Sequence, residues 1–145
     1  MCDFQILIEE LKRDDIHDIL ELWNKEKDVL GIPFRKTIFD LIDAHSFFGI
    51  KIDGKLIAMC GYKIMKRNPS IRITKLCVDE EYRNQGIASM FIRLIQNKTN
   101  SLELKMYAEC KDGANNNGFY EKIGILHHKE ERKTMSVRFY EIKEL

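Results

Sequence analysis

The chain has 145 residues, a length that suits one folded domain and is too short for two of ordinary size. Apolar residues make up 44% and charged residues 32%, with a net charge of +1, which argues against an intrinsically disordered chain and against a nucleic-acid partner. The start of the chain lacks the pattern of a signal peptide, and no apolar stretch is long enough to span a membrane. We therefore expect a single cytoplasmic α/β domain over residues 1–145, with no membrane partner.

The cysteines favour a reducing compartment over a secreted or metal-binding protein. None of the four belongs to a CxxC pair: Cys2, Cys60, Cys77 and Cys110. His127 and His128 form the one histidine pair, and adjacent residues of a strand point to opposite faces. We therefore expect neither a disulfide framework nor a metal site.

Apolar periodicity predicts one strand and two helices in the first third of the chain. Residues 4–10 are rich in Phe and Ile and predict a strand. Asp14 or Asp15 can accept hydrogen bonds from the first amides of a helix. Four apolar residues then recur on one helical face: Ile16, Ile19, Leu20 and Trp23. Gly31-Ile32-Pro33 breaks the chain, and residues 36–44 predict a second short helix.

A hairpin and a third strand follow. Apolar residues alternate over 48–52, and residues 56–65 form the returning strand. Asp53-Gly54 between them suits a two-residue turn, because both positions tolerate a positive φ. Another alternating run covers 71–78, and its period of two places Thr74 and Leu76 on the same face of the strand.

The second half of the chain mixes strands and helices. A helix is predicted at 86–96, a strand at 102–109, and a short helix at 117–122 that Gly124 ends. Two final strands are predicted at 125–128 and 135–142, and the charge run at 129–133 between them predicts a solvated turn. Early hairpins and later helical crossovers together predict a mixed sheet flanked by helices, of the α/β class.

The segment from Val78 to Ser89 contains the clearest chemical signal. A strand is predicted to end near Val78, and a helix to begin near Gly86, so the helix start exposes unpaired amides and a partial charge of about +0.5. Gly86 has no Cβ and Ala88 has only a methyl group, so a large anion can approach the backbone closely. Arg83 adds a positive charge that can pair with phosphate. Taken alone, the pattern also fits an ordinary strand–loop–helix turn.

Two motifs resemble those of a known family. Leu76-Cys77-Val78 followed by Arg83-Asn84-Gln85-Gly86-Ile87-Ala88 resembles the acyl-CoA motif R/Q-x-x-G-x-G/A of the GCN5-related N-acetyltransferase (GNAT) family. Phe119-Tyr120-Glu121-Lys122-Ile123-Gly124-Ile125 resembles the second family motif, F-Y-E-K-x-G-F. The resemblance covers residues 48–125. It implies a GNAT-like, mostly antiparallel sheet and an N-acetyltransferase that moves the acetyl group of acetyl-CoA to a primary amine of a small molecule or polypeptide.

The resemblance also implies roles for single residues. Backbone groups of Leu76 and Val78, with Cys77 between them, pair with the pantetheine amides, and the Val78 amide is the oxyanion donor. Tyr120 donates a hydrogen bond to the departing thiolate. The pyrophosphate is held by a run of backbone amides: Arg83, Asn84, Gln85, Gly86, Ile87, Ala88 and Ser89.

An asparagine ahead of Tyr120 often contacts the cofactor in the family, and here the chain departs from the pattern. The family often has Asn and Ala six and three residues before the Phe of its second motif, where this chain has Gly113 and Asn116. Asn115 and Asn117 are nearby substitutes for the cofactor contact, and spacing does not decide between them.

The general base stays open. Making a lysine-like amine neutral at pH 7 costs roughly 4–5 kcal/mol, against about 1–1.5 kcal/mol for an α-amine, so the first substrate needs a base more. The position that matches a family glutamate holds Arg72. Glu109, Glu10 and Asp79 are candidates, as are a water relay and an already neutral amine. Cys110 with His127 or His128 is a further nucleophilic pair, which no spacing supports.

The acceptor amine is also open. The resemblance places acceptor recognition in residues 23–39 and 129–140, where Arg35 and Lys36 could attract an anionic acceptor. It also suggests a homodimer formed through the C-terminal strands. Two other functions compete with the enzyme: a catalytically silent acyl-CoA-binding sensor or interaction module, and a small α/β protein without a CoA site.

Overall fold

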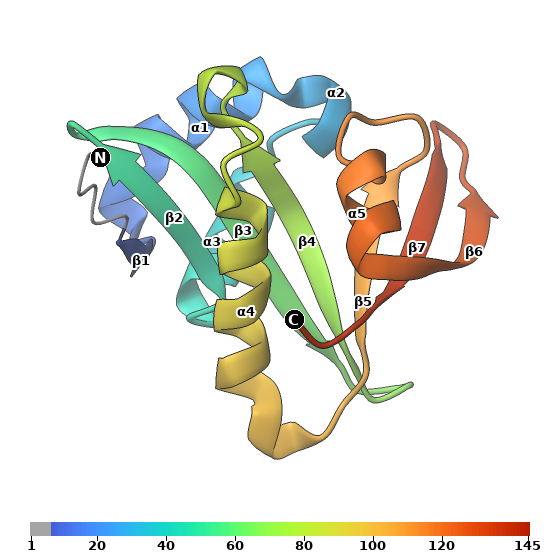
Figure 1. Cartoon of the computed structure of the whole chain (residues 1–145). Helices are drawn as coiled ribbons and strands as arrows, with labels where there is room; N and C mark the ends of the chain where they lie inside the picture. The colour runs from blue at the N-terminus through green and yellow to red at the C-terminus, as the bar shows by residue number, and fades with distance from the viewer. Residues whose placement is uncertain (1–6) are drawn as a thin grey trace.

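The computed structural model describes residues 7–145, in which seven strands form one sheet. The strands are β1 (Ile8–Glu10), β2 (Phe47–Ile52), β3 (Lys55–Met65), β4 (Ser70–Val78), β5 (Met106–Lys111), β6 (Gly124–Glu131) and β7 (Ser136–Ile142). Their order is β1-β2-β3-β4-β5-β7-β6, and every neighbouring pair is antiparallel except β4 and β5 (Figure 1). This confirms the predicted mixed, mostly antiparallel sheet of an α/β fold.

Helices cover both faces of the sheet. They are α1 (Ile16–Lys25), α2 (Lys27–Leu30), α3 (Arg35–Asp43), α4 (Ile87–Thr99) and α5 (Asn117–Ile123). Side chains of α4 and α5, such as Phe91 and Tyr120, join the core on one face, and those of α1 and α3, such as Trp23 and Leu41, form the core on the other (Figure 1). No helix within residues 7–145 is long and apolar enough to cross a bilayer.

Most predicted elements are present, with shifted boundaries. The hairpin turns at Asp53-Gly54, where φ is 52° and 78°, as the sequence predicts. The strand predicted from residue 102 begins only at Met106, because the chain continues through a 3₁₀ turn and Glu103 then takes a φ of 51°. Of the strand predicted at 4–10, the part at Ile8–Glu10 is found, and residues 4–6 lie outside the described part of the chain.

The predicted turn at 129–133 is wrong, because its first half belongs to a strand. β6 continues to Glu131, paired with β7. Its side chains are exposed along nearly its whole length, since β6 is the edge of the sheet. A run of charges indicates solvent exposure, and an edge strand meets that condition as well as a turn does.

β4 contains a bulge that simple alternation does not predict. Lys75 and Leu76 together lie opposite one residue of β3, Cys60, where the register of the two strands shifts. Lys75 has a φ of 56°, which is the left-handed conformation of one bulge type. Leu76 therefore packs in the core beneath α4 together with Ile73, on the face opposite to the one that alternation predicts.

β4 and β5 are parallel neighbours that separate towards their C-terminal ends. Residues 71–73 of β4 pair with residues 106–108 of β5, and beyond them the two strands diverge, with α5 beside the gap (Figure 1). From Thr74 to Val78, β4 pairs with β3 alone among the described strands. The sheet is therefore open on this side of β4.

Candidate functional site

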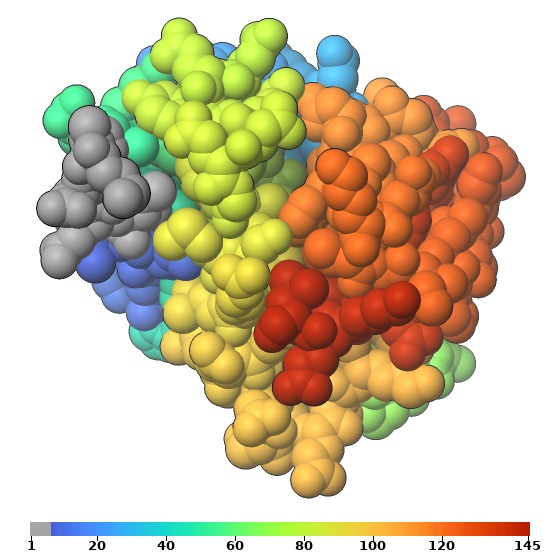
Figure 2. Space-filling model, in the orientation of Figure 1, coloured from blue at the N-terminus to red at the C-terminus, as the bar shows by residue number. Residues whose placement is uncertain are grey.

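A cavity of about 570 Å³ lies at the open end of the β4–β5 split, where the loop before α4 (yellow-green) meets α5 (orange) in Figure 2. Ten of the twelve residues predicted to bind the cofactor line it: Leu76, Cys77, Val78, Arg83, Asn84, Gly86, Ile87, Ala88, Ser89 and Asn115. Gln85, Asn117 and Tyr120 are not part of this lining. The fold thus gathers the end of β4, the loop and the start of α5 around one space.

The first turn of α4 faces this cavity with its backbone amides. Gly86 is the N-cap residue and has no side chain that could bond to these amides. Its φ is 78°, and a Cβ built there meets no atom within 4 Å, so the space beside it is open. Ile87, Ala88 and Ser89 continue the cavity wall. A helix start of this kind attracts an anion through unpaired N–H groups and the helix dipole.

Arg83 lines the cavity but is already bound to protein groups. Its Nη2 lies 2.5 Å from Oε1 of Glu26, and its Nε donates to the Val78 carbonyl over 3.0 Å. Glu26 is buried at the junction of α1 and α2 and also lines the cavity. Sequence reasoning assigned Arg83 to phosphate and missed Glu26, because no local pattern links residues 57 positions apart.

The three consecutive asparagines before Tyr120 have different surroundings. Asn117 is buried, and its amide group bonds to the Cys110 thiol, the Lys111 carbonyl and the Gly113 amide, so it shapes the loop. Asn115 and Asn116 line the cavity. The Oδ1 atom of Asn116 is buried and has no hydrogen-bond partner among the described residues.

Asn116 is thus a residue that sequence reasoning passed over, since it stands where the family pattern has alanine. A buried amide oxygen without a donor is unfavourable by about 1–3 kcal/mol, so a bound molecule with an N–H or O–H group would satisfy it. This is the kind of unpaired group that a binding site retains for its ligand.

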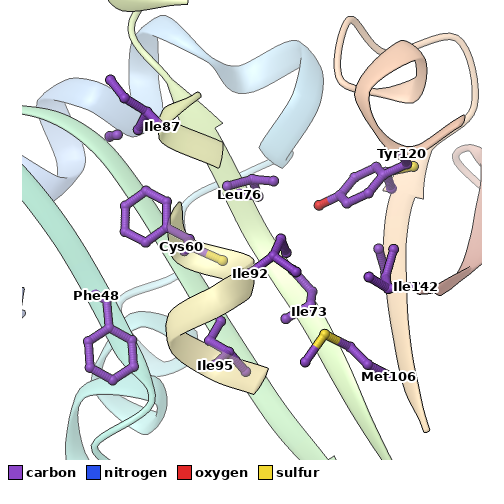
Figure 3. Close-up of a cluster of buried hydrophobic side chains, with 14 of the residues drawn as sticks. Phe48, Cys60, Ile73, Leu76, Ile87, Ile92, Ile95, Met106, Tyr120 and Ile142 are labelled. Carbon is purple, nitrogen blue, oxygen red and sulfur yellow. The ribbon is translucent and has the colours of Figure 1, made fainter. Parts of the chain in front are cut away.

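Tyr120 is enclosed in the core between α5, α4 and the sheet. Only 1% of its surface is exposed, and its ring stacks on Tyr140 with 5.7 Å between centroids. Figure 3 shows its hydroxyl directed away from α5, towards Leu76 of β4 and Ile92 of α4. Burial raises the pKa of Tyr120 well above its usual value of 10, because the anion would be poorly solvated there.

A family model decides the family to which this fold belongs. The model of the acetyltransferase (GNAT) family matches residues 8–125, which is well over half of the chain. The chain belongs to the GNAT family. No curated protein sequence matches it.

Solved structures support the GNAT fold at low sequence identity. N-acetylglutamate synthase from Neisseria gonorrhoeae, complexed with coenzyme A and N-acetyl-glutamate, has a TM-score of 0.75 at 14% identity over 99% of this chain, which spans 36% of that protein. Naa50 from Arabidopsis thaliana, in complex with the bisubstrate analogue CoA-Ac-MVNAL, has a TM-score of 0.75 at 13% identity, with 97% of this chain and 100% of that chain covered.

A third similar structure is an acetyltransferase from Salmonella typhimurium that modifies the N-terminal serine of ribosomal protein L7/L12. Its TM-score is 0.76 at 14% identity, with 96% of this chain and 95% of that chain covered. At such identities these likenesses show the fold, and they do not transfer a substrate.

The candidate bases of this GNAT chain are all held by cations. Asp79 is buried, which by itself raises its pKa, but the Glu81 amide and the ammonium groups of Lys25 and Lys55 outweigh burial and lower it. A hydrogen bond to His45 lowers the pKa of Glu10 in the same way. Carboxylates with lowered pKa values are poorer bases.

Glu109 is the third candidate base, and two arginines hold it. Its carboxylate lies 3.0 Å from Arg132 and 3.6 Å from Arg72. Arg72, which stands where the family has a glutamate, therefore pairs with the Glu109 carboxylate in the structure.

Cys110 is no nucleophile in this environment. Burial raises the pKa of its thiol to about 12, and its sulfur accepts a hydrogen bond from Asn117. His127 and His128 contact each other; His127 packs edge-on against Tyr107, and His128 stacks on Phe139. Within residues 7–145 no group of three or more His, Cys, Asp or Glu side chains could hold a metal ion.

A second cavity of about 140 Å³ lies on the other side of the β4–β5 split. Its wall is formed by the end of α2, the bulge of β4, the end of β5 and the start of β7 with the turn before it. Leu76 and Asn116 belong to the lining of both cavities. The two spaces therefore meet across these residues.

Proposed function

We propose that the chain is an acyl-CoA-dependent N-acyltransferase that moves the acetyl group of acetyl-CoA to a primary amine of a small molecule or polypeptide. The observation that carries the proposal is the open backbone of β4 beside the amide-lined start of α4, with both facing one cavity. An extended chain of amides that ends in a pyrophosphate, which is the shape of CoA, suits both features.

Three further observations support acetyl-CoA as the co-substrate. The cavity volume of about 570 Å³ lies within the usual range of ligand pockets, roughly 300–1,000 Å³. The unpaired Oδ1 of Asn116 can accept a hydrogen bond from a ligand amide or hydroxyl. Two of the similar structures are complexed with CoA or a CoA-containing analogue.

The reaction forms one bond and breaks one. The neutral amine nitrogen attacks the thioester carbonyl carbon, the C–N bond forms, and the C–S bond breaks with its electron pair leaving on sulfur. The nitrogen loses one proton and the thiolate gains one, so the products are an amide and free CoA thiol. The transient oxyanion needs a donor, and we assign the Val78 amide to this role.

We assign Tyr120 as the hydrogen-bond donor to the developing thiolate. A CoA thiol resembles a free cysteine, with a pKa of about 8.5, against about 10 for tyrosine, so full proton transfer from Tyr120 is uphill by roughly 2 kcal/mol. Burial raises the pKa of Tyr120 further, which makes transfer harder and keeps the hydroxyl protonated. The final proton on sulfur therefore comes from solvent.

Calorimetry with CoA and an acceptor screen scored by thiol release test the proposal together. We expect CoA to bind with a dissociation constant well below millimolar, and thiol release with at least one class of amine. Binding without release across amino acids, polyamines, aminoglycosides and peptides would favour the silent acyl-CoA sensor. A dissociation constant no tighter than millimolar would refute both readings of the site.

Three further expectations extend the proposal to the whole protein: one domain over residues 1–145, a cytoplasmic location, and a homodimer formed through the C-terminal strands. β6 is an exposed edge strand with Ile125 and Leu126 on its surface, which makes it the strand most open to pairing. Size-exclusion chromatography with light scattering measures the oligomeric state directly.

A further inference from the structure

The second cavity is the route by which an acceptor amine would reach the thioester, if the proposed function holds. The CoA cavity and the second cavity share Leu76 and Asn116 in their linings, so they adjoin each other at the β4–β5 split. At about 140 Å³, the second cavity holds roughly five water volumes, which suits a compact small molecule. Its side chains therefore bear on which amine is accepted.

Lys75 is the side chain that stands out in this second cavity. The bulge of β4 places it on the wall, with its Nζ 3.4 Å from the Leu30 carbonyl and 5.2 Å from the centre of the Trp23 ring. Both partners are neutral. No carboxylate within residues 7–145 lies within 4 Å of this ammonium. Exposed lysines such as Lys66 also have no such partner, but Lys75 is only partly exposed and lines a cavity.

The other charged groups of the cavity leave it positive. Lys111 and Arg132 also line it, and Glu109 is the single carboxylate of the lining. That carboxylate is shared between Arg132 and Arg72 and so offers little to an incoming cation. A cationic acceptor such as a polyamine would meet net repulsion here, and an anionic group would meet attraction.

We propose that the acceptor is a small amine that also carries a carboxylate, such as a free amino acid, and that Lys75 binds this carboxylate in the second cavity. The inference rests on the proposed function and names the substrate class of the same site. Lys75 is then a substrate-binding residue, and the bulge that sets its position in β4 is part of the specificity. Arg35 and Lys36, which the sequence suggested for an anion, do not line this cavity.

The partial burial of Lys75 agrees with the position of its side chain in the cavity wall. Burial lowers the pKa of Lys75, because the ammonium loses water, and the more distant Glu109 offsets only part of this loss. A charge-assisted hydrogen bond from a substrate carboxylate would supply the missing counter-charge.

The experiment compares L-amino acids with their C-terminal primary amides as acceptors. Thiol release gives kcat/KM for each member of a pair, and the ratio of acid to amide cancels effects common to both. We expect Lys75→Met to lower this ratio about tenfold or more for the preferred amino acid, with CoA affinity unchanged. Lys75→Arg should restore part of the ratio, and Lys66→Met, at an exposed lysine of the β3–β4 turn, should leave it as in the wild type.

Direct binding separates the failure of this inference from the failure of the proposed function. Calorimetry measures the affinity of the same amino acids and amides for the wild type and for Lys75→Met, with CoA binding as the check on folding. An acid-to-amide preference that is equal in the two proteins overturns the role of Lys75, whether or not turnover is seen. Loss of that preference in Lys75→Met, even in a protein that releases no thiol, supports the carboxylate site and contradicts only the proposed catalysis.

Discussion

Tyr120 shows how the surroundings of one side chain narrow its chemistry. Its ring is packed against Tyr140 and Phe119, and none of the described residues hydrogen-bonds to its hydroxyl, which points towards the β4–β5 split. A hydroxyl that stays protonated and unpaired in the resting protein can donate to a charge that appears only during reaction. Such an interaction, which is stronger in the transition state than in the ground state, is the kind that accelerates a chemical step.

Tyr120→Phe should therefore lower kcat by about tenfold to a hundredfold while leaving the affinity for CoA unchanged. The free energy of unfolding should stay level or change only slightly, because no hydrogen bond to another of the described residues is lost. Stopped-flow thiol release, CoA calorimetry and urea unfolding measure the three quantities. The matched control is Tyr140→Phe, whose hydroxyl bonds to Arg138 and which is not part of the cavity lining, so its kcat should change little. A wild-type kcat in Tyr120→Phe would remove Tyr120 from catalysis.

Gly86 and Gly118 both line the larger cavity, which we propose for CoA, but they have opposite backbone requirements. Gly86 has a φ of 78°, where an L side chain is unfavourable by roughly 1–2 kcal/mol, and Gly118 lies within helix α5, where alanine is preferred by about 1 kcal/mol. Gly86→Ala should thus lower the free energy of unfolding and Gly118→Ala should raise it. Urea midpoints of the two variants measure both signs, and equal shifts in the same direction would contradict the left-handed conformation at Gly86.

At the scale of elements, the loop before α4 is tied to α1 and α2 through the pair of Arg83 and Glu26. Glu26 is largely buried and forms its ion pair with Arg83, while the Arg83 side chain keeps a third of its surface exposed. The pair therefore joins two parts of the wall of the larger cavity, the loop before α4 and the junction of α1 and α2.

Arg83→Met should lower the free energy of unfolding by about 1–3 kcal/mol, less than a fully buried pair would lose, because solvent reaches the arginine side. Glu26→Gln in the same chain should restore most of the loss, since no uncompensated carboxylate remains. A double-mutant cycle from urea unfolding gives the coupling between the two residues. Additive losses from the two single variants would show that the ion pair does not couple the layers.

The elements that sequence predicts well are those specified by local pattern. The Asp53-Gly54 hairpin, the helix α4 and the short α5 before Gly124 follow from turn chemistry and helical periodicity. The bulge at Lys75 does not follow from local pattern. An inserted residue leaves the apolar composition of the strand unchanged, but it moves the side chains that follow to the other face of the sheet. The length of β6 does not follow from local pattern either, because its exposure on the edge of the sheet resembles that of a turn.

The site was predictable where a motif covers it and not where distant segments meet. The loop from Arg83 to Ser89 lines the cavity apart from Gln85, as the motif implies. Glu26, just before α2, and Lys75, in the β4 bulge, line the cavities only because the fold brings these segments there. No spacing in the sequence reveals this. Which of the three adjacent asparagines is available to a ligand depends on which side-chain amide forms hydrogen bonds within the loop. Only the folded loop decides this.

At the scale of the whole molecule, the two cores on opposite faces of the sheet each enclose thiols. Cys60 and Cys110 lie in the core under α4 and α5, and Cys77 lies in the core under α1 and α3. All three are free cysteines. Burial raises the pKa of each of them above the usual value near 9, because a thiolate would lose its water in either core.

Stability should therefore fall as the pH rises above about 9. In the unfolded chain a cysteine loses its proton near pH 8.5, whereas the buried thiol keeps it, so the folded state binds more protons at alkaline pH. A pKa that is raised on folding gives stability that is complete below the unfolded value and is lost above it, by at most about 1.4 kcal/mol per pH unit for each thiol. Up to about pH 9.5 most lysines and tyrosines of the unfolded chain keep their protons, which leaves the thiols as the main contribution, and above it the raised pKa of Tyr120 adds a loss of the same sign.

Urea unfolding at several pH values between 7 and 10 measures this slope. Cys60→Ala should lower the free energy of unfolding at every pH, because it leaves a small cavity in the core beneath α4. Between pH 8.5 and 10 the free energy of unfolding of this variant should nevertheless fall less steeply with pH than that of the wild type, by up to about 1.4 kcal/mol per pH unit. The reason is that the variant lacks one thiol that keeps its proton in the folded state and loses it in the unfolded chain. A slope identical to that of the wild type would mean that the Cys60 thiol ionises as easily in the folded protein as in the unfolded chain, and that water reaches the core beneath α4.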